Sequence, residues 1–261
     1  MGAGQALPLH VVGGRLAVPR ALTCDTDDVR GQGKPYPHKL PMGFSIPRLY
    51  AIIDPARADG RLPAVVAREL FSAGVRLIQF RDKRASSRQL YETCVELKEL
   101  LRKSSCSLIV NDRADVARAT EADGVHLGQD DLPVEMARQV LGSDKWIGCS
   151  THSVDQVVEA DRSTADYIAF GPIFPTASKE NPDPVVGLEG LQEARRVTRK
   201  PLVAIGGITL QNAQEVLAAG ADSVAVIGDL LNAPDIGARA REFLSVLGDQ
   251  LKSKDSGFRS R

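Results

Sequence analysis

Residues 202–228 read LVAIGGITLQNAQEVLAAGADSVAVIG, and this stretch holds one complete repeat of the pattern that decides the fold. An apolar run at 202–205 is followed by two glycines, and a segment with helical spacing then ends at Gly220. A second apolar run at 223–227 is followed by another glycine. Continuous apolar runs are typical of parallel strands covered on both faces, so the stretch predicts a strand, a helix and a parallel strand.

The same alternation extends over most of the chain. Eight short apolar runs recur, at Leu49–Ile53, Val75–Phe80, Ser107–Val110, Gly124–Leu127, Trp146–Cys149, Tyr167–Phe170, Leu202–Ile205 and Ser223–Ile227. Eight strands alternating with helices in about 200 residues predict a single α/β domain, a closed (β/α)8 or TIM barrel. An open doubly wound sheet is disfavoured because no Gly-x-Gly-x-x-Gly follows the first run.

Prolines and glycines mark the helix boundaries. Pro63 is placed as a first-turn proline, and the helix that it begins is predicted to end at Gly74. Residues 236–251 carry apolar side chains at helical spacing and predict the last helix.

The first 47 residues differ from the rest of the chain. They hold six of the fifteen prolines and seven of the 23 glycines, and their apolar residues follow no period. We therefore predict a disordered or irregular N-terminal extension over 1–47, a barrel over 48–250 and a flexible tail over 251–261. Translation from Met42 is an alternative explanation of the extension, because it gives a chain that begins just before the first strand.

Charge and composition argue against several classes of function. Lys and Arg number 33 and Asp and Glu number 33, so the zero net charge disfavours a nucleic-acid or membrane-surface protein. No apolar run approaches the roughly 20 residues of a membrane span, and no secretory signal is recognised. The cysteines have no metal-binding spacing, and we interpret them as free thiols of a cytoplasmic protein. They are Cys24, Cys94, Cys106 and Cys149.

Polar residues gather where the predicted strands end, which is where barrels of this kind build their functional site. Cations follow the second run, and acidic residues follow the third and fourth. Carboxylates beside cations suit a magnesium ion and a phosphorylated ligand, although each aspartate alone could instead cap the next helix. The residues concerned are Gln79, Arg81, Lys83, Asn111, Asp112 and Asp131.

The later strand ends provide hydroxyl groups, a lysine and glycines. Ser150 and His152 follow the fifth run, whereas His126 lies inside the fourth and is interpreted as a buried core histidine. A loop of roughly 16 residues follows the sixth run, and loops of this length are commonly functional. Glycines after the seventh and eighth runs lie where many such barrels bind phosphate. The residues of these loops that we single out are Thr176, Ser178, Lys179, Gly207, Ile227 and Gly228.

Several segments, in this order and spacing, resemble the thiamine phosphate synthase family. The resemblance covers about residues 48–245 and leaves out the N-terminal extension. One departure is Gly228, which stands where relatives often carry serine. The matching segments are LYAI at 49–52, Gln79-x-Arg81-x-Lys83, Asn111-Asp112-Arg113, GVHLGQDD at 124–131, Ser150-Thr151-His152, GPIFPT-x-Ser178-Lys179 from Gly171, and IGGI at 205–208.

The resemblance implies a transferase that joins 4-amino-2-methyl-5-hydroxymethylpyrimidine diphosphate to 4-methyl-5-(2-hydroxyethyl)thiazole phosphate and releases pyrophosphate. It implies Mg²⁺ as the cofactor, held by Asp112 and Asp131. For the pyrimidine diphosphate it implies Gln79, Arg81, Lys83, Asn111, Ser150 and Lys179, with Arg81, Ser150 and Lys179 as the catalytic residues. For the thiazole phosphate it implies Thr176, Ser178, Gly207, Ile227 and Gly228.

The implied reaction is dissociative. Pyrophosphate leaves, and the thiazole nitrogen traps a pyrimidine-stabilised cation, so positioning and charge stabilisation suffice without a side-chain nucleophile. A thiazole tautomerase on the same barrel is the main alternative, since His152 would suit its proton transfer. A noncatalytic barrel that binds thiamine precursors is the second. The combination of Asp112 and Asp131 with nearby cations favours the synthase, with small-molecule partners only; a homo-oligomer is compatible with this organisation.

Overall fold

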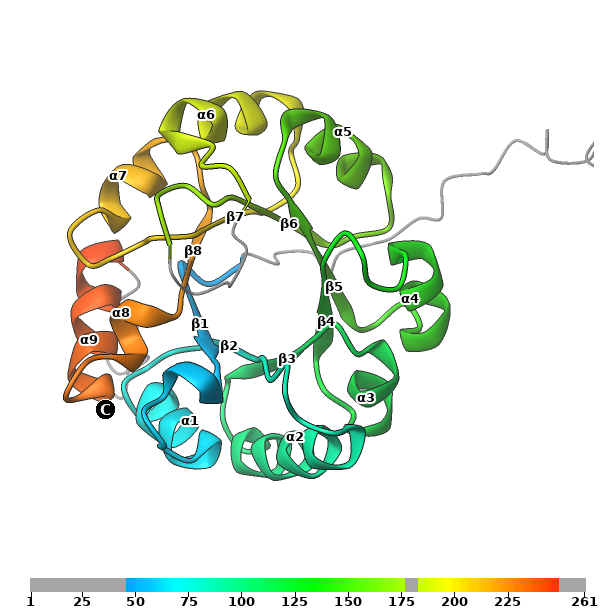
Figure 1. Ribbon diagram of the computed structural model, residues 1–261, viewed down its shortest axis with the longest axis vertical. Helices are drawn as coiled ribbons and strands as arrows, with labels where there is room; N and C mark the ends of the chain where they lie inside the picture. The colour runs from blue at the N-terminus through cyan, green and yellow to red at the C-terminus, as the bar shows by residue number, and fades with distance from the viewer. Residues whose placement is uncertain (1–45, 177–182, 249–261) are drawn as a thin grey trace, which may run out of the picture. The chain divides into compact units, whose positions relative to one another are not determined.

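The computed structural model describes residues 46–176 and 183–248. Within these ranges, eight parallel strands close into a barrel that is surrounded by helices (Figure 1). The strands pair in chain order, and β8 pairs with β1 to complete the ring. The predicted single (β/α)8 barrel is therefore confirmed. The predictions for an N-terminal extension, a start at Met42 and a C-terminal tail fall almost wholly outside the described residues.

Four of the eight strands agree residue for residue with the predicted runs. Strand β2 begins two residues later than predicted, and β8 ends one residue earlier. Strands β3 and β5 run further, because their last residues are polar and escape a search for apolar runs. The strands are β1 Leu49–Ile53, β2 Leu77–Phe80, β3 Ser107–Asn111, β4 Gly124–Leu127, β5 Trp146–Thr151, β6 Tyr167–Phe170, β7 Leu202–Ile205 and β8 Ser223–Val226.

The helices begin and end close to the predicted signals. Pro63 is the first residue of its helix, as predicted. The last helix ends at Leu247 rather than 251, because Gly248 adopts the left-handed conformation, at φ 71°, that terminates helices. The helices are α1 Pro63–Ser72, α2 Ser87–Leu101, α3 Ala114–Ala119, α4 Val134–Leu141, α5 Val154–Arg162, α6 Gly187–Val197, α7 Ala213–Ala218, α8 Gly228–Leu231 and α9 Ile236–Leu247. Within the described ranges, no helix is both long and apolar enough to cross a membrane.

Apolar side chains from the strands form two separate layers. One layer packs between the barrel and its helices, and the other fills the barrel interior. Alternate residues of a strand face opposite sides, so β1, β2, β3, β6, β7 and β8 contribute buried apolar side chains to both layers, which explains their nearly continuous apolar runs. The interior layer consists of Ile46, Tyr50, Ile52, Leu77, Ile109, Tyr167, Ala169, Val203 and Ala225.

Three of the four cysteines lie within the described residues, and each is a free, buried thiol. This confirms that Cys94, Cys106 and Cys149 are free thiols, whereas Cys24 lies outside the described residues. Burial raises the pKa of the Cys94 and Cys106 thiols to about 12, so these thiols stay protonated and unreactive.

An aspartate precedes each of β4, β6 and β8 and ties neighbouring strands together at the amino-terminal end of the barrel. In each case an alanine stands before it, as in Ala165-Asp166. Each carboxylate accepts a hydrogen bond from a backbone N–H at or near the start of the preceding strand, and each pairs with a cation from a helix. The pairs are Asp123 with Lys98, Asp166 with Arg138, and Asp222 with Arg195.

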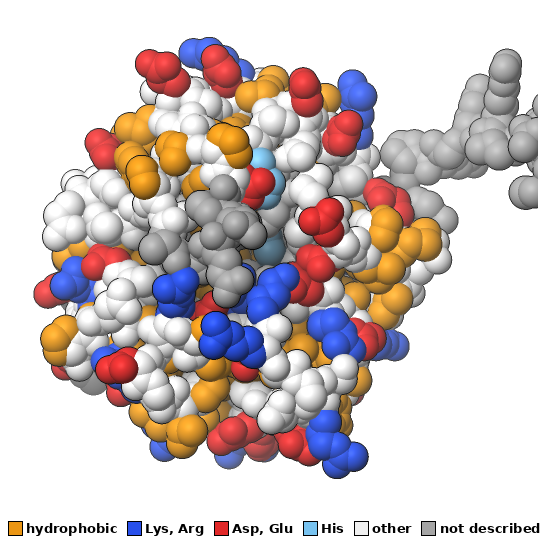
Figure 2. All heavy atoms as spheres, in the orientation of Figure 1, with side chains coloured by type: hydrophobic (Ala, Val, Ile, Leu, Met, Phe, Trp, Pro, Cys, Tyr) orange, Lys and Arg blue, Asp and Glu red, His pale blue; other side chains and the backbone are white. Residues whose placement is uncertain are grey.

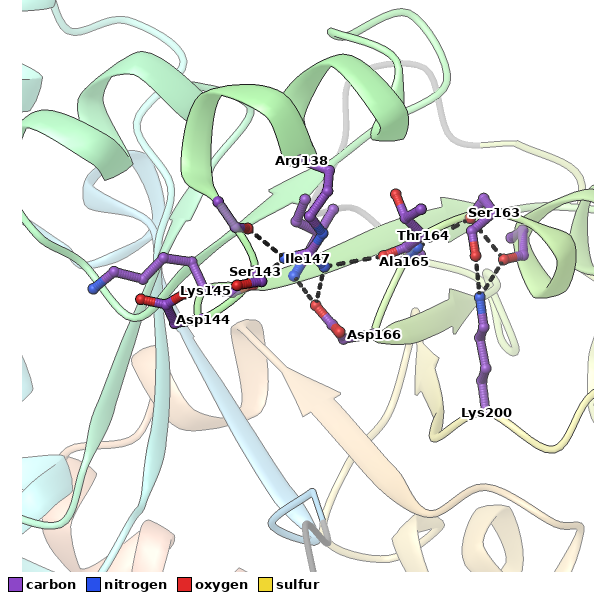
Figure 3. Close-up of polar contacts among 12 residues, drawn as sticks. Arg138, Ser143, Asp144, Lys145, Ile147, Ser163, Thr164, Ala165, Asp166 and Lys200 are labelled. Atoms are coloured by element: carbon purple, nitrogen blue, oxygen red, sulfur yellow. Dashed lines mark hydrogen bonds and ion pairs between the residues drawn. The ribbon is translucent and has the colours of Figure 1, made fainter. Parts of the chain in front are cut away.

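The pair of Asp166 and Arg138 is the most deeply buried of the three (Figure 3). Their side chains are 13% and 10% exposed, whereas Asp123 is 31% and Asp222 is 48% exposed. Arg138 also donates to the carbonyl oxygens of Gly142, Lys145 and Thr164. The guanidinium therefore binds three loop carbonyls and one carboxylate, and it joins α4 to the start of β5 and β6.

The burial of these three carboxylates predicts which of them contributes most to the free energy of unfolding and which contributes least. Each Asp→Asn change keeps an acceptor for the backbone N–H and removes the charge. Asp166→Asn leaves a buried arginine without a counter-ion and is expected to cost about 3 kcal/mol or more. Asp222→Asn affects a pair exposed to solvent and is expected to cost at most about 1 kcal/mol, with Asp123→Asn between them. Urea unfolding of the three variants measures this order, and equal losses would contradict it.

Candidate active site

The strand ends surround a cavity of about 520 Å³ at the mouth of the barrel. The space-filling view down the barrel shows Lys and Arg side chains gathered near the centre, with Asp and Glu beside them (Figure 2). Residues from all eight strands and from the loop after β6 meet in this one space. The predicted site residues that line it are Gln79, Arg81, Asn111, Ser150, Thr176, Gly207, Ile227 and Gly228.

Arg81 is held by a buried carboxylate that sequence reasoning missed. Its Nη1 forms an ion pair with Oδ2 of Asp54, which directly follows β1 and is buried. The other oxygen of Asp54 accepts the N–H of Ala56 at 3.0 Å and so fixes the carboxylate in turn. A guanidinium has five N–H donors, so the remaining ones can bind a ligand in the cavity. The position of Asp54 immediately after the first strand is the signal that could have identified it.

Asp112 lies beside the cavity rather than in its lining, and it contacts the Lys83 ammonium group. Its backbone adopts the left-handed conformation, with φ 63°. The N-cap position of α3 is Arg113, which makes no side-chain cap, so the reading of Asp112 as a helix cap is wrong. Lys83 is half-exposed and does not line the cavity, although Gln79 and Arg81 from the same segment do.

Asp131 is the second carboxylate at this edge of the mouth. Its Oδ2 accepts the N–H of Gly128 at 2.7 Å, which stabilises the loop after β4, and Pro133 rather than an aspartate occupies the N-cap of α4. Burial, together with the Asp131 carboxylate, raises the pKa of Asp112, and Lys83 opposes this shift. A divalent cation would stabilise the charged form of Asp112, which burial and the neighbouring Asp131 disfavour.

The two carboxylates alone do not form a complete ligand set. Among the described residues, no group of three or more His, Cys, Asp or Glu side chains could hold a metal ion. Magnesium commonly binds through one or two carboxylates and takes its other ligands from water and substrate phosphates. Asp112 and Asp131 therefore fit a magnesium ion that binds together with a phosphorylated substrate.

A chain of polar side chains runs through the barrel interior below the cavity. Its members are Gln79, Tyr50, Tyr167, His126 and Ser150, joined by hydrogen bonds of 2.8, 2.9, 3.1 and 2.9 Å. His126 is buried with both ring nitrogens bonded, as interpreted from the sequence, but it also lines the cavity and contacts Ser150. Burial raises the pKa of both tyrosines above the ordinary value, so both hydroxyls remain protonated. Sequence reasoning missed the two tyrosines, because an aromatic residue in an apolar run resembles ordinary core.

His152 contacts both sides of the loop that follows β6. Its Nδ1 lies 2.6 Å from the carbonyl oxygen of Gly171, and its Nε2 lies 3.4 Å from a carboxylate oxygen of Asp183. The loop spans the 16 residues between the end of β6 and the start of α6, which is the predicted length. Ser178 and Lys179 lie outside the described residues. The helix cap at this strand end is Ser153, which leaves the Ser150 hydroxyl in the cavity.

Glycines shape the opposite side of the cavity. Gly206 and Gly207 have φ values of 100° and 63°, which favour glycine. A Cβ on Gly207 would lie 2.5 Å from the carbonyl oxygen of Pro175, so the loops after β6 and β7 pack backbone against backbone. The short helix α8 begins at Gly228, directly after β8. Glycine loops after β7 and β8 with a short extra helix are the usual phosphate site of such barrels.

A closed (β/α)8 barrel with cations, paired carboxylates and this glycine site at its mouth defines a phosphate-handling barrel enzyme. The family model for thiamine monophosphate synthase matches residues 49–230. The chain therefore belongs to the thiamine monophosphate synthase family, and it is a transferase.

Curated relatives and a solved structure agree with this family. A thiamine-phosphate synthase of Koribacter versatilis is 52% identical over 194 residues, which cover 72% of this chain and 91% of the relative. One from Chloroflexus aurantiacus is 44% identical over 180 residues, covering 69% and 83%. The solved thiamine phosphate pyrophosphorylase from Pyrococcus furiosus matches with a TM-score of 0.71 at 37% identity, covering 77% of this chain and 96% of that one. The tautomerase and the noncatalytic barrel gain no support from these relatives.

The raised pKa of Asp112 predicts that Asp112→Asn does not destabilise the protein in the absence of metal. Asparagine tolerates the left-handed conformation and removes a charge that burial and Asp131 disfavour. A carboxyl group whose pKa is higher in the folded state than in the unfolded state stabilises the fold at pH values below its pKa in the unfolded state. This contribution is lost as the pH rises through its pKa in the folded state. The variant is therefore expected to unfold at an equal or higher urea concentration near about pH 7, with this gain shrinking towards about pH 4. A clear loss of stability near neutral pH would contradict the prediction.

Proposed function

We propose that this barrel joins 4-amino-2-methyl-5-hydroxymethylpyrimidine diphosphate to 4-methyl-5-(2-hydroxyethyl)thiazole phosphate, giving thiamine phosphate and pyrophosphate. The observation that carries the proposal is the single cavity at the mouth. Amide, hydroxyl and guanidinium groups line its β2–β5 side, and the glycine loops line its β7–β8 side. Two phosphorylated ligands can therefore bind next to each other, as bond formation between them requires.

The β2–β5 side fits an aminopyrimidine that carries a diphosphate. Gln79 and Asn111 offer amide groups that can hydrogen-bond to the edge of the ring, and Ser150 offers a hydroxyl. Arg81, fixed by Asp54, is placed to bind the diphosphate through its remaining N–H groups. We propose that Lys83 adds positive charge at the rim and that Lys179, which lies outside the described residues, contacts the diphosphate from the loop after β6.

Asp112 and Asp131 would hold Mg²⁺ at the edge of this half of the site. When bound, the ion would supply Lewis-acid neutralisation of the leaving diphosphate. The chain's own contribution is to hold the two carboxylates close together and to keep the Lys83 ammonium against Asp112. The thiazole phosphate would lie on the β7–β8 side, where backbone amides at Gly207, Ile227 and Gly228, together with Thr176 and Ser178, bind its phosphate.

The reaction then requires positioning rather than a side-chain nucleophile. The leaving pyrophosphate takes the electron pair of the C–O bond, and the amino-substituted ring stabilises the resulting methylene cation. The lone pair of the thiazole nitrogen closes the new C–N bond. Arg81 and Lys179 stabilise the charge that develops on pyrophosphate, and Ser150 orients the pyrimidine. The loop after β6 would keep water from capturing the cation. A cytoplasmic location remains a prediction from the sequence, and a homo-oligomer is compatible with it.

The direct test is release of pyrophosphate by the full chain with both substrates and Mg²⁺. The proposal predicts release that needs both substrates and stops on addition of EDTA, with thiamine phosphate formed in equal amount. Asp112→Asn is expected to lower the rate by about 10²-fold or more, because it removes half of the protein's ligand set for the metal. Release without the thiazole phosphate, or a full rate in EDTA, would contradict the proposal.

Two glycine substitutions test the assigned phosphate side. A Cβ on Gly228 meets only Asn232 Nδ2, at an ordinary 3.6 Å, so Gly228→Ser fits and adds a hydroxyl donor at the phosphate. The KM for the thiazole phosphate is expected to fall, by up to about tenfold for one charge-assisted hydrogen bond, with little change in kcat. Gly207→Ala is the contrasting variant, since its Cβ meets the Pro175 carbonyl oxygen at 2.5 Å, and it is expected to raise that KM. Steady-state kinetics with the pyrimidine substrate saturating measures both, and an unchanged KM in both variants would refute the assignment.

A further inference from the structure

The hydrogen-bond chain inside the barrel has both of its ends in the cavity. Gln79 stands at one end and Ser150 at the other, and both line the cavity. Between them, Tyr50, Tyr167 and His126 are buried within the barrel. Four hydrogen bonds connect the five side chains without a break. A change of hydrogen-bond direction at one end must therefore be accommodated at the other.

The direction of the chain follows from the amide of Gln79. Its Nε2 can only donate, and it donates to the Tyr50 oxygen at 2.8 Å. The Tyr50 proton must then point to the Tyr167 oxygen, 2.9 Å away, because among the described residues this is the acceptor that the Tyr50 hydroxyl contacts. The Tyr167 proton is left to bond Nδ1 of His126, which must be the unprotonated ring nitrogen.

The remaining links follow in the same way. With Nδ1 as acceptor, the neutral His126 ring carries its proton on Nε2, which donates to the Ser150 oxygen at 2.9 Å. The Ser150 proton is then directed away from the chain and into the cavity. At the other end, the Gln79 oxygen has no partner among the described residues. The cavity thus meets an acceptor at Gln79 and a donor at Ser150.

The barrel makes specific room for this arrangement. A Cβ at Gly148 of β5 would lie 2.1 Å from Cζ of Tyr167, so only glycine lets the tyrosine ring lie across the interior. The His126 ring stacks on the Tyr167 ring, with centroids 5.6 Å apart and planes at 25°. The two tyrosine rings meet edge to face. The three buried members of the chain are therefore held by packing as well as by hydrogen bonds.

We propose that Tyr50, Tyr167 and His126 are positioning residues that polarise this chain in one direction and thereby set the specificity of the cavity for an amino-substituted ring. The inference rests on the proposed function and extends it. The amino group donates to the Gln79 oxygen, and a ring nitrogen accepts from Ser150. A ring that carries an oxo group in place of the amino group needs a hydrogen-bond donor at Gln79. The amide would then have to turn over, and every hydrogen bond of the chain would have to reverse.

The first experiment observes the tautomer of His126 in the full chain without any substrate. The histidines are labelled with ¹⁵N. The chain has four histidines, and the signals of His126 are identified as those that are missing from the spectrum of His126→Gln. We expect the chemical shifts of an unprotonated Nδ1 and a protonated Nε2. The opposite tautomer, or a ring protonated on both nitrogens, would overturn the proposal. Because this measurement needs no turnover, it stands even if the proposed reaction fails.

The second experiment compares binding of the 4-amino and 4-oxo forms of the pyrimidine diphosphate in EDTA, where turnover is blocked. The wild type is expected to prefer the amino form by about 10²-fold or more, as sites built from buried hydrogen-bonding groups do. Tyr167→Phe breaks the chain in the middle, and the preference is expected to fall by about tenfold, because the Gln79 amide can then turn over without reversing the other bonds. Calorimetric titration gives both dissociation constants.

The control removes a different buried hydroxyl. In Thr120→Val the lost group bonds a helix carbonyl at 2.8 Å and is not part of the chain. This variant is expected to keep both the wild-type preference and the wild-type tautomer. Where Tyr167→Phe does not fold, Tyr50→Phe interrupts the same chain at the next link. An unchanged preference in a folded variant of either tyrosine would overturn the proposal. An absence of turnover in the wild type, with the expected tautomer present, would count against the proposed reaction alone.

Discussion

Closure of the barrel is the constraint on which the rest of the structure depends. Because β8 pairs with β1 and every strand is parallel to its neighbours, all eight strands end at one mouth. A residue that directly follows any strand is therefore brought towards the same cavity, however far apart such residues lie in the sequence. Gln79 and Gly228 are separated by most of the barrel sequence, yet both line this one cavity.

Residues at one end of the barrel stabilise the fold, whereas residues at the other end form the candidate active site. At the amino-terminal end, Asp123, Asp166 and Asp222 satisfy backbone N–H groups and pair with helix cations, an arrangement that favours the folded state. At the mouth, Asp112 has a left-handed backbone and a carboxylate whose charge is disfavoured by burial and by Asp131. Such features cost stability and are typical of sites that await a ligand. The bonds at the amino-terminal end offset part of that cost.

The fold and much of the site could be predicted from sequence, for a physical reason. Parallel strands buried on both faces leave apolar runs that are easy to recognise, and in a barrel the residue after each run belongs to the mouth. Prediction was poorest where polar and apolar roles mix. The polar ends of β3 and β5 extend past the apolar runs. Tyr50 and Tyr167 look like core, and their hydroxyl contacts depend on the three-dimensional approach of β1 to β6 across the barrel. Asp54 was missed because its partner Arg81 lies on another strand end.

The central claim is that one cavity holds both halves of the product. Thiamine phosphate should then occupy the pyrimidine side and the thiazole phosphate side together, and either substrate alone should displace it. Equilibrium binding of thiamine phosphate, measured by calorimetry at rising fixed concentrations of each substrate, tests this most directly. The account predicts an apparent dissociation constant that rises without limit, in proportion to the concentration of either substrate. A rise that levels off, or no effect from one of the substrates, would place the two ligands in separate sites and contradict the account.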